Sequence, residues 1–239
     1  MNAELFLQKY RILEDLLEKR YAGERIGSSS VVIEYLHSVD SREVRTDLDT
    51  MRELRNLLTH NSDEFGYPIA EPSDRTLARM DEIIEYVRKP RLAIQFGTPA
   101  DQIMCTEINE RAIDVMRAMR NRGYSHIPVL DHGVFVGIFS VKALFNYLAE
   151  NGLDGLHEDS RIRDLGDMLN VEQRDSESYC FMPADATINE VREEFRKTSR
   201  QNKKLAMVLI TQNGEKSSAL LRVLTPWDVL DDRIIAQKE

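Results

Sequence analysis

The feature that most constrains this chain is an internal repeat in its second half. A helix, two apolar strands and a second helix occur in that order, and the same order returns farther along the chain. The elements are expected at 112–119, 126–130, 134–140 and 143–148, and again at 188–195, 205–210, 219–224 and 226–230. Turn residues separate the strands of each pair, Asp131-His132-Gly133 in the first and Asn213-Gly214 in the second. Repetition of one supersecondary unit predicts two α/β domains of the same kind.

The first ninety residues have a different pattern and are expected to be all-helical. Apolar residues recur at helical spacing in four segments, 6–21, 31–36, 44–60 and 77–87, with a loop at 61–72. Four short amphipathic helices indicate a small bundle, and its size favours a partner subunit. The multidomain α and α/β chain is therefore divided into a helical bundle at 1–90, a linker at 91–100, a first repeat at 101–150, a connecting segment at 151–178 and a second repeat at 179–239.

Composition and charge limit the functions that this chain can have. Its 239 residues are 42% hydrophobic and 31% charged, and no apolar run approaches the ~20 residues of a membrane span. The N-terminus lacks the pattern of a signal peptide, and Cys105 and Cys180 are not in a metal-binding motif. These features favour a cytoplasmic protein without a membrane partner or a metal site. The net charge of −9 argues against broad nucleic-acid binding, so no DNA is expected and any RNA contact would be local.

Three motifs in the repeated half resemble those of tandem CBS-domain pairs. They are Gln102-Ile103-Met104, then Ser125-His126-Ile127-Pro128-Val129 leading to Gly137-Ile138-Phe139-Ser140, and Leu224-Thr225-Pro226-Trp227-Asp228 in the second copy. The resemblance covers residues 92–235 and implies a tandem pair of βαββα type, packed into one disc with a ligand cleft on either side. It also implies a regulatory ligand, which would be an adenine nucleotide (AMP, ADP or ATP) or a related nucleotide.

The same resemblance implies which residues contact the nucleotide. In CBS pairs the contact is a Ser/Thr-x-x-Asp sequence at the end of the last strand, and Thr225 and Asp228 match it. A hydroxyl at a helix N-terminus would help to hold phosphate, and the Asp would accept hydrogen bonds from the ribose. Ser140 in the first copy is followed by Val141-Lys142-Ala143 without the Asp, so one competent cleft is expected. The implied ligand-binding residues are Thr225, Asp228, Ser140, His126 and Pro128.

Each of these assignments has a structural alternative. Thr225 and Ser140 would be only helix caps, and Asp228 only a first-turn acid favoured by the helix dipole. His126 would have a structural role in its strand. Trp227 would either stack on a base or pack half-exposed against the protein.

A second motif, Arg55-Asn56-Leu57-Leu58-Thr59-His60, ends the third helix expected in the bundle. Taking about 100° per residue, Arg55 falls between Val44 and Leu48 on the apolar arc. Asn56 and His60, four residues apart, lie one above the other on the next face. A charged group on a core-facing arc is costly unless it is paired or used.

This hexapeptide fits the Arg-Asn-x-x-x-His pattern of the HEPN superfamily, whose helical fold residues 3–90 resemble. The resemblance implies a metal-independent endoribonuclease of the toxin, defence or RNA-processing kind. Such an enzyme acts as a homodimer on RNA and leaves 2′,3′-cyclic phosphate and 5′-hydroxyl ends without a cofactor. The implied catalytic residues are Arg55, which would hold the phosphate oxygens, Asn56, which would orient His60 or hold the phosphate, and His60, which would move a proton.

The sequence therefore predicts a HEPN-type ribonuclease that is regulated by a nucleotide bound to the CBS pair. The alternative is a non-catalytic nucleotide sensor whose helical region only dimerises or docks a partner. Arg55 would then pair with a carboxylate inside the bundle, such as Glu14 or Glu18, and His60 would cap the helix C-terminus. A third interpretation, transfer of a nucleotidyl group by the same cluster, would require a separate partner chain to supply the metal site.

Overall fold

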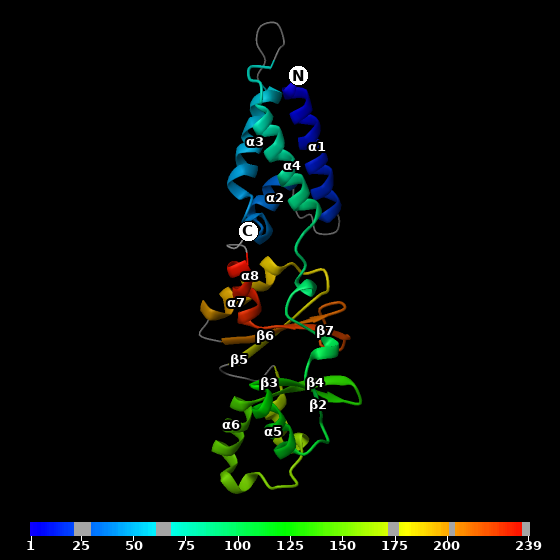
Figure 1. Cartoon of the computed structure of the whole chain (residues 1–239), viewed down its shortest axis with the longest axis vertical. Coiled ribbons are helices and arrows are strands. Elements are labelled where there is room, and N and C mark those ends of the chain that lie inside the picture. The colour runs from blue at the N-terminus through cyan, green and yellow to red at the C-terminus, as the bar shows by residue number, and fades with distance from the viewer. Residues whose placement is uncertain (22–29, 61–67, 172–176, 201–203, 236–239) are drawn as a thin grey trace. The chain divides into compact units, whose positions relative to one another are not determined.

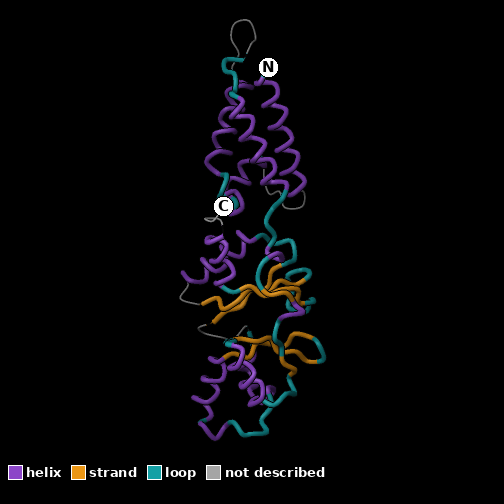
Figure 2. Tube along the Cα trace, viewed as in Figure 1, coloured by secondary structure: helices purple, strands orange, loops and turns teal. Residues whose placement is uncertain are grey.

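The computed structural model describes residues 1–21, 30–60, 68–171, 177–200 and 204–235, and the chain divides into two compact units. Unit 1 spans Met1–Arg91 and unit 2 spans Leu92–Glu239. Unit 1 is helical, whereas unit 2 combines helices with two sheets (Figures 1 and 2). The prediction of an N-terminal helical region followed by an α/β region is confirmed.

Unit 1 contains α-helices at the four segments where the apolar periodicity predicts them. They are α1 (Asn2–Arg20), α2 (Val31–His37), α3 (Arg45–His60) and α4 (Asp74–Arg88). A short 3₁₀ helix, Val39–Ser41, lies between α2 and α3. The side chain of Ser73 caps α4, because its hydroxyl oxygen accepts a hydrogen bond from the Thr76 amide at 3.2 Å. The loop predicted at 61–72 falls partly on 61–67, which lie outside the described residues.

One apolar core holds the helices of unit 1 together. Its largest side chains come from positions three and four apart on each helix, so that one face of every helix is buried. Burying such a side chain contributes about 1.5–3 kcal/mol. The members that are at most 2% exposed include Phe6, Tyr10, Leu13, Leu17, Val32, Tyr35, Leu48, Met80 and Ile83.

Copy one of the repeat in unit 2 runs from β2 to α6. Strand β2 (Thr106–Glu107) pairs in parallel with β3 (His126–Asp131), which pairs antiparallel with β4 (Val134–Ser140). The helices are α5 (Ala112–Arg122) and α6 (Val141–Asn151). His132 and Gly133 connect β3 to β4 with φ angles of 49° and 79°. Positive φ at both positions is the signature of a two-residue type I′ turn, so the predicted hairpin is confirmed.

Copy two runs from β5 to α8 and repeats the same order. Strand β5 (Glu177–Met182) is parallel to β6 (Lys204–Thr211), and β6 is antiparallel to β7 (Leu220–Leu224). The helices are α7 (Ile188–Arg200) and α8 (Pro226–Ile235).

Two details of copy two differ from the sequence prediction. The sequence motifs do not locate strand β5, the first strand of the βαββα unit that the resemblance implies. Asn213-Gly214 lies within a longer loop at 212–219, in which the Asn213 side chain accepts a hydrogen bond from the Glu215 amide at 3.1 Å and turns the chain locally.

The segments that precede the two copies are exchanged between them. Strand β1 (Thr98–Pro99) precedes copy one but pairs antiparallel with β7 of copy two. The 3₁₀ segment Ile162–Leu169 precedes copy two but buries Ile162 and Leu165 in the core of copy one. Each copy therefore needs the other's leading segment to complete its core, and unit 2 is expected to unfold cooperatively.

The two sheets of unit 2 face each other between the helices of copy one and those of copy two (Figure 2). The apolar side chains between the sheets include Phe135, Ile138, Met207, Leu209 and Val223. The rings of Phe135 and Phe181 meet edge to face with centroids 5.4 Å apart. This packing places the start of β3, the start of β6 and the end of β7 around one cavity.

Candidate functional site

A cavity of about 800 Å³ lies between the two copies of unit 2. Copy one contributes Tyr124 and His126 to its wall, and copy two contributes Glu177, Lys204, Thr225 and Trp227. The cavity lies within the range of about 300–1,000 Å³ that is usual for small-molecule sites. Its wall combines aromatic rings, a carboxylate, an amine and a hydroxyl.

Thr225 lies in the cavity wall at the N-terminus of α8, directly after β7. Its amide and its hydroxyl both donate to the Asp228 carboxylate oxygen Oδ2, at 2.6 Å and 2.7 Å. Pro226 occupies the first helical position, where a missing N–H removes no helical hydrogen bond. Asp228 is not among the residues that line the cavity. The structure thus brings Thr225 and Asp228 together and presents Thr225 to the cavity.

His126 lines the same cavity and belongs to a polar cluster that joins the two copies. Its Nε2 atom lies 3.5 Å from Oε2 of Glu177, and its Nδ1 atom lies 2.8 Å from the Ser125 hydroxyl. The hydroxyls of Ser140 and Tyr179 donate to the same Glu177 oxygen at 3.4 Å and 3.3 Å. Three polar groups therefore converge on one carboxylate that is only 14% exposed.

Ser140 is fully buried and caps α6, because its hydroxyl oxygen accepts a hydrogen bond from the Ala143 amide at 3.0 Å. Pro128 lines a smaller neighbouring cavity of about 90 Å³, together with Ile103 and Thr225. Of the five residues that the sequence assigned to ligand binding, His126 and Thr225 line the large cavity. Asp228, Ser140 and Pro128 do not line it.

Sequence reasoning missed Glu177 and Tyr179, both on β5. The only sequence signal for this strand is a short alternation in which Tyr179 and Phe181 are separated by Cys180. That alternation is too brief to distinguish a strand from the connecting segment. Lys204, at the start of β6, was also missed because a single lysine beside a strand has no distinguishing pattern.

The residues of the Arg-Asn-x-x-x-His motif lie on α3 of unit 1. Nη2 of Arg55 lies 3.4 Å from Oε1 of Glu14, and Nη1 donates to the Asn56 side-chain oxygen at 3.1 Å. The Arg55 guanidinium also lies over the Tyr10 ring, 5.5 Å from its centroid. Arg55 thus forms the ion pair with Glu14 that the structural interpretation predicted. His60 is exposed at the last residue of the helix.

The surroundings of Arg55 alter the titration of its neighbours. Burial raises the pKa of the Glu14 carboxyl, and the nearby Arg55 guanidinium opposes that rise. Burial, together with the Glu14 charge, raises the pKa of Tyr10 to about 12. Burial is the largest cause of both rises, and the Arg55 guanidinium is a positive charge that opposes them.

Tyr10 predicts an alkaline loss of stability in unit 1. The raised pKa keeps the Tyr10 hydroxyl protonated to a higher pH in the folded state than in the unfolded state. Its contribution to the free energy of unfolding is therefore complete below pH ~10 and is lost as the pH rises toward about 12. We expect the loss to reach about 2 kcal/mol. Urea unfolding of the wild type and Tyr10→Phe between pH 9 and pH 11.5, followed by circular dichroism, measures it. Equal pH dependence in the two proteins would contradict the prediction.

No group of three or more His, Cys, Asp or Glu side chains that could hold a metal ion occurs among the described residues. Within the same residues, no helix has both the length and the apolar character required to cross a membrane.

Comparison with known proteins identifies the class of part of unit 2. Residues 99–150 match the family model of the CBS domain. No curated protein matches the chain. Many solved structures match part of the chain, and each of the following is only distantly similar in sequence.

Three examples show the extent of the similarity. CBSX2 in complex with AMP is 13% identical, covers 62% of this chain and 98% of its own, and has a TM-score of 0.45. The CBS domain of the bacterial CNNM/CorC family Mg²⁺ transporter in complex with ATP is 19% identical, covers 65% and 94%, and has a TM-score of 0.42. A CBS domain protein from Streptococcus pneumoniae TIGR4 is 16% identical, covers 59% and 82%, and has a TM-score of 0.43.

The match assigns residues 99–150 to the CBS domain family, and the C-terminal unit has a CBS-like α/β fold. The resemblance of the helical unit to the HEPN superfamily stays a prediction.

Proposed function

We propose that this protein is a non-catalytic regulator that binds an adenine nucleotide in the cavity of unit 2. The observation that carries the proposal is the position of Thr225, which lies in the wall of an 800 Å³ cavity at the start of a helix and beside Asp228. The CBS match of residues 99–150 supports the same reading. AMP, ADP, ATP or a related nucleotide would be the regulatory ligand.

The wall of the cavity offers partners for each part of such a ligand. The N-terminus of α8 places the positive end of a helix dipole beside Thr225, where a phosphate would be stabilised. The Lys204 amine adds a positive charge on the same wall. Glu177 adds a hydrogen-bond acceptor for ribose hydroxyls or for the amine of the base.

In this proposal the helical unit forms a homodimer or docks a partner, and the protein works in the cytoplasm. Leu5 and Ile12 lie on one side of α1 and are 43% and 45% exposed, and Leu57 on α3 is 40% exposed. In this proposal these side chains would contribute apolar contacts to the interface with the second copy or the partner. The free thiols of Cys105 and Cys180 fit a reducing compartment.

Calorimetric titration of the full chain with AMP, ADP, ATP and CTP tests the proposal. We expect at least one adenine nucleotide to bind with one site per chain and to raise the melting temperature by mass action. CTP is the control, because it shares the ribose and the phosphates but has a smaller base. Absence of binding by all three adenine nucleotides would overturn the proposal.

We propose HEPN-type RNA cleavage as a second candidate function. The observation that favours it is the hydrogen bond between Arg55 and Asn56 on the helix that ends at the exposed His60. Two such clusters in a homodimer would supply the base, the acid and the positive charge that cleavage needs. The nucleotide in unit 2 would then favour one of two dimer arrangements and so control activity.

His60→Ala gives this second candidate a direct test. Wild type and variant are incubated with RNA in EDTA, with and without AMP or ATP, and the new ends are mapped. If the candidate is correct, the wild type produces 2′,3′-cyclic phosphate ends and the variant loses at least about 100-fold in rate, as general acid–base catalysis predicts. The exposed position of His60 means that the variant should keep the wild-type melting temperature. No cleavage by either protein leaves the regulator as the function.

A further inference from the structure

Trp227 is exposed in a way that packing does not explain. It lies two residues after Thr225, lines the cavity and is 75% exposed. The half-exposed packing role that the sequence offered as an alternative is therefore wrong for this side chain. A tryptophan side chain contributes favourable free energy mainly when its large apolar ring is buried against another group. In a cavity of this size, the covering surface would come from a bound molecule.

A second exposed aromatic side chain faces the same cavity from the other copy. Tyr124 is 43% exposed and follows Gly123, which ends α5 in the left-handed conformation with φ of 73°. The Tyr124 amide donates to the Met119 carbonyl oxygen at 3.0 Å, so its backbone is held in place. Phe195 on α7 also contributes to the wall. Aromatic rings from both copies thus line the cavity that Thr225 borders.

The equivalent position in copy one has a different chemistry. The residue two positions after Ser140 is Lys142, whereas the residue two positions after Thr225 is Trp227. A lysine at that position would attract phosphate, whereas the negative face of an indole ring would not. The indole is instead suited to a flat aromatic group, because base–aromatic stacking is favourable for every nucleobase.

We propose that Trp227 stacks on the base of the bound nucleotide, with Tyr124 contacting the same ligand from copy one. The inference rests on the proposed nucleotide-binding function of this cavity. The ligand thereby bridges the two copies, and the purine ring determines specificity because it offers more stacking area than a pyrimidine. Trp227 is thus a specificity-determining residue that neither the CBS match nor the Thr-x-x-Asp motif identifies.

The chain contains a single tryptophan, so its fluorescence reports on this position alone. The full chain is titrated with AMP while tryptophan emission is recorded, and the dissociation constant is measured separately by calorimetry. We expect the emission to change and to saturate with the same constant. Trp227→Ala should weaken AMP binding by about five- to one-hundred-fold, which corresponds to about 1–3 kcal/mol per stacked base at ~1.4 kcal/mol per tenfold. Trp227→Phe should restore most of the affinity.

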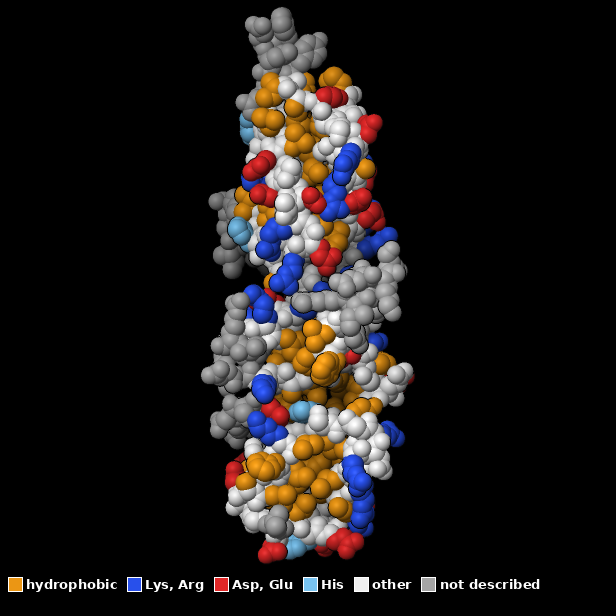
Figure 3. Space-filling view, turned by 60° about the vertical axis from the view of Figure 1, so that its left-hand side comes forward, with side chains coloured by type: hydrophobic (Ala, Val, Ile, Leu, Met, Phe, Trp, Pro, Cys, Tyr) orange, Lys and Arg blue, Asp and Glu red, His pale blue; other side chains and the backbone are white. Residues whose placement is uncertain are grey.

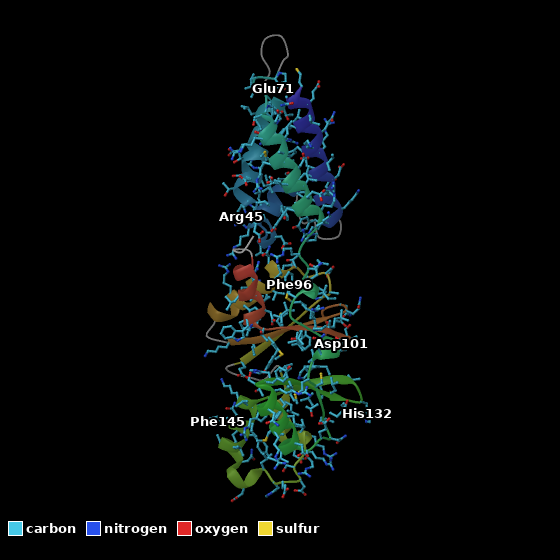
Figure 4. The ribbon with its side chains drawn as sticks, viewed as in Figure 1. Arg45, Glu71, Phe96, Asp101, His132 and Phe145 are labelled. Atoms are coloured by element: carbon cyan, nitrogen blue, oxygen red, sulfur yellow. The ribbon has the colours of Figure 1, made fainter. Side chains whose placement is uncertain are left out.

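Phe145→Ala is the matched control. Phe145 on α6 (Figure 4) is 70% exposed but is not among the residues that line the cavity. Its replacement should leave the affinity for AMP unchanged. The comparison separates contact with the ligand from a general effect of removing an exposed aromatic side chain.

The outcomes distinguish the inference from the proposal on which it rests. If the wild type binds AMP but the emission is constant and Trp227→Ala binds equally well, base stacking is wrong and the nucleotide site stands. If no adenine nucleotide binds to the wild type, both are overturned. If the emission depends on protein concentration instead of AMP, a second copy covers Trp227 and the stacking inference is overturned.

Discussion

Gly97→Ala should destabilise unit 2 by about 3–5 kcal/mol. Gly97 has φ of 70°, and a Cβ atom there would lie 2.3 Å from the Val223 carbonyl oxygen and 2.9 Å from the Leu224 side chain. The Val223 carbonyl oxygen cannot shift away from the new Cβ atom without disturbing the β1–β7 pairing, because Thr98 pairs with Val223. Urea unfolding followed by the fluorescence of Trp227, which lies in unit 2, measures the loss. Since Val223 and Leu224 directly precede Thr225, AMP binding should weaken as well.

Gly123→Ala is the matched control for this variant. Gly123 has nearly the same φ, 73°, but a Cβ atom there would meet nothing within 4 Å. Only the cost of the left-handed conformation remains, about 1–2 kcal/mol. Equal losses for the two variants would show that the close approach of Gly97 to Val223 does not matter. Because Gly123 also borders the cavity, its unfolding curve, and not its ligand affinity, is the control measurement.

Asp228→Ala should weaken AMP binding by about ten- to one-hundred-fold. A hydrogen bond to a charged group contributes about 1.5–3 kcal/mol, and the variant removes the carboxylate that would accept from the ribose. It also removes the acceptor for the Thr225 amide and hydroxyl, so the hydroxyl loses its fixed orientation. Loss of these contacts at the start of α8 should lower the stability of unit 2 by about 0.5–2 kcal/mol. Calorimetry measures the affinity, and urea unfolding measures the stability.

Two further variants separate the two roles of Asp228. Asp228→Asn keeps an acceptor oxygen, so we expect stability near that of the wild type and reduced affinity for AMP. Asp114→Ala removes the first-turn acid of α5 and should leave the affinity unchanged, because Asp114 pairs with Arg111 and Arg117 and contacts no described residue of the cavity wall comparable to Thr225. If Asp228→Ala binds AMP as tightly as the wild type does, Asp228 is only a helix cap and the ribose contact is wrong.

The elements that the sequence predicts well are those determined by neighbouring residues. The helices of unit 1 follow the apolar periodicity, and Ser73 caps α4 through a contact three residues away. The β3–β4 hairpin follows from His132 and Gly133, which adopt the positive φ that its tight turn requires. These features need no information from distant parts of the chain, because the contacts that form them are local.

The site was predictable only in part. The Thr-x-x-Asp motif is local, so the hydrogen bond between Thr225 and Asp228 follows from their spacing at a helix start. The Ser140 hydroxyl donates a hydrogen bond to Glu177, which lies 37 residues farther along the chain, and no spacing rule predicts that contact. The exposure of Trp227 likewise depends on the cavity formed when the two copies pack.

By itself, the sequence determined a helical first part, a repeated α/β second part, the Thr225–Asp228 pair and the partners available to Arg55. Of those partners, the tertiary structure selected Glu14, on a helix 41 residues away. It also decided that β1 pairs with β7 of copy two and that Ile162 fills the core of copy one. The physical reason is the range of the interactions. Periodicity and turn chemistry act over a few residues, whereas strand exchange, ion pairing and cavity formation depend on which distant surfaces bury each other.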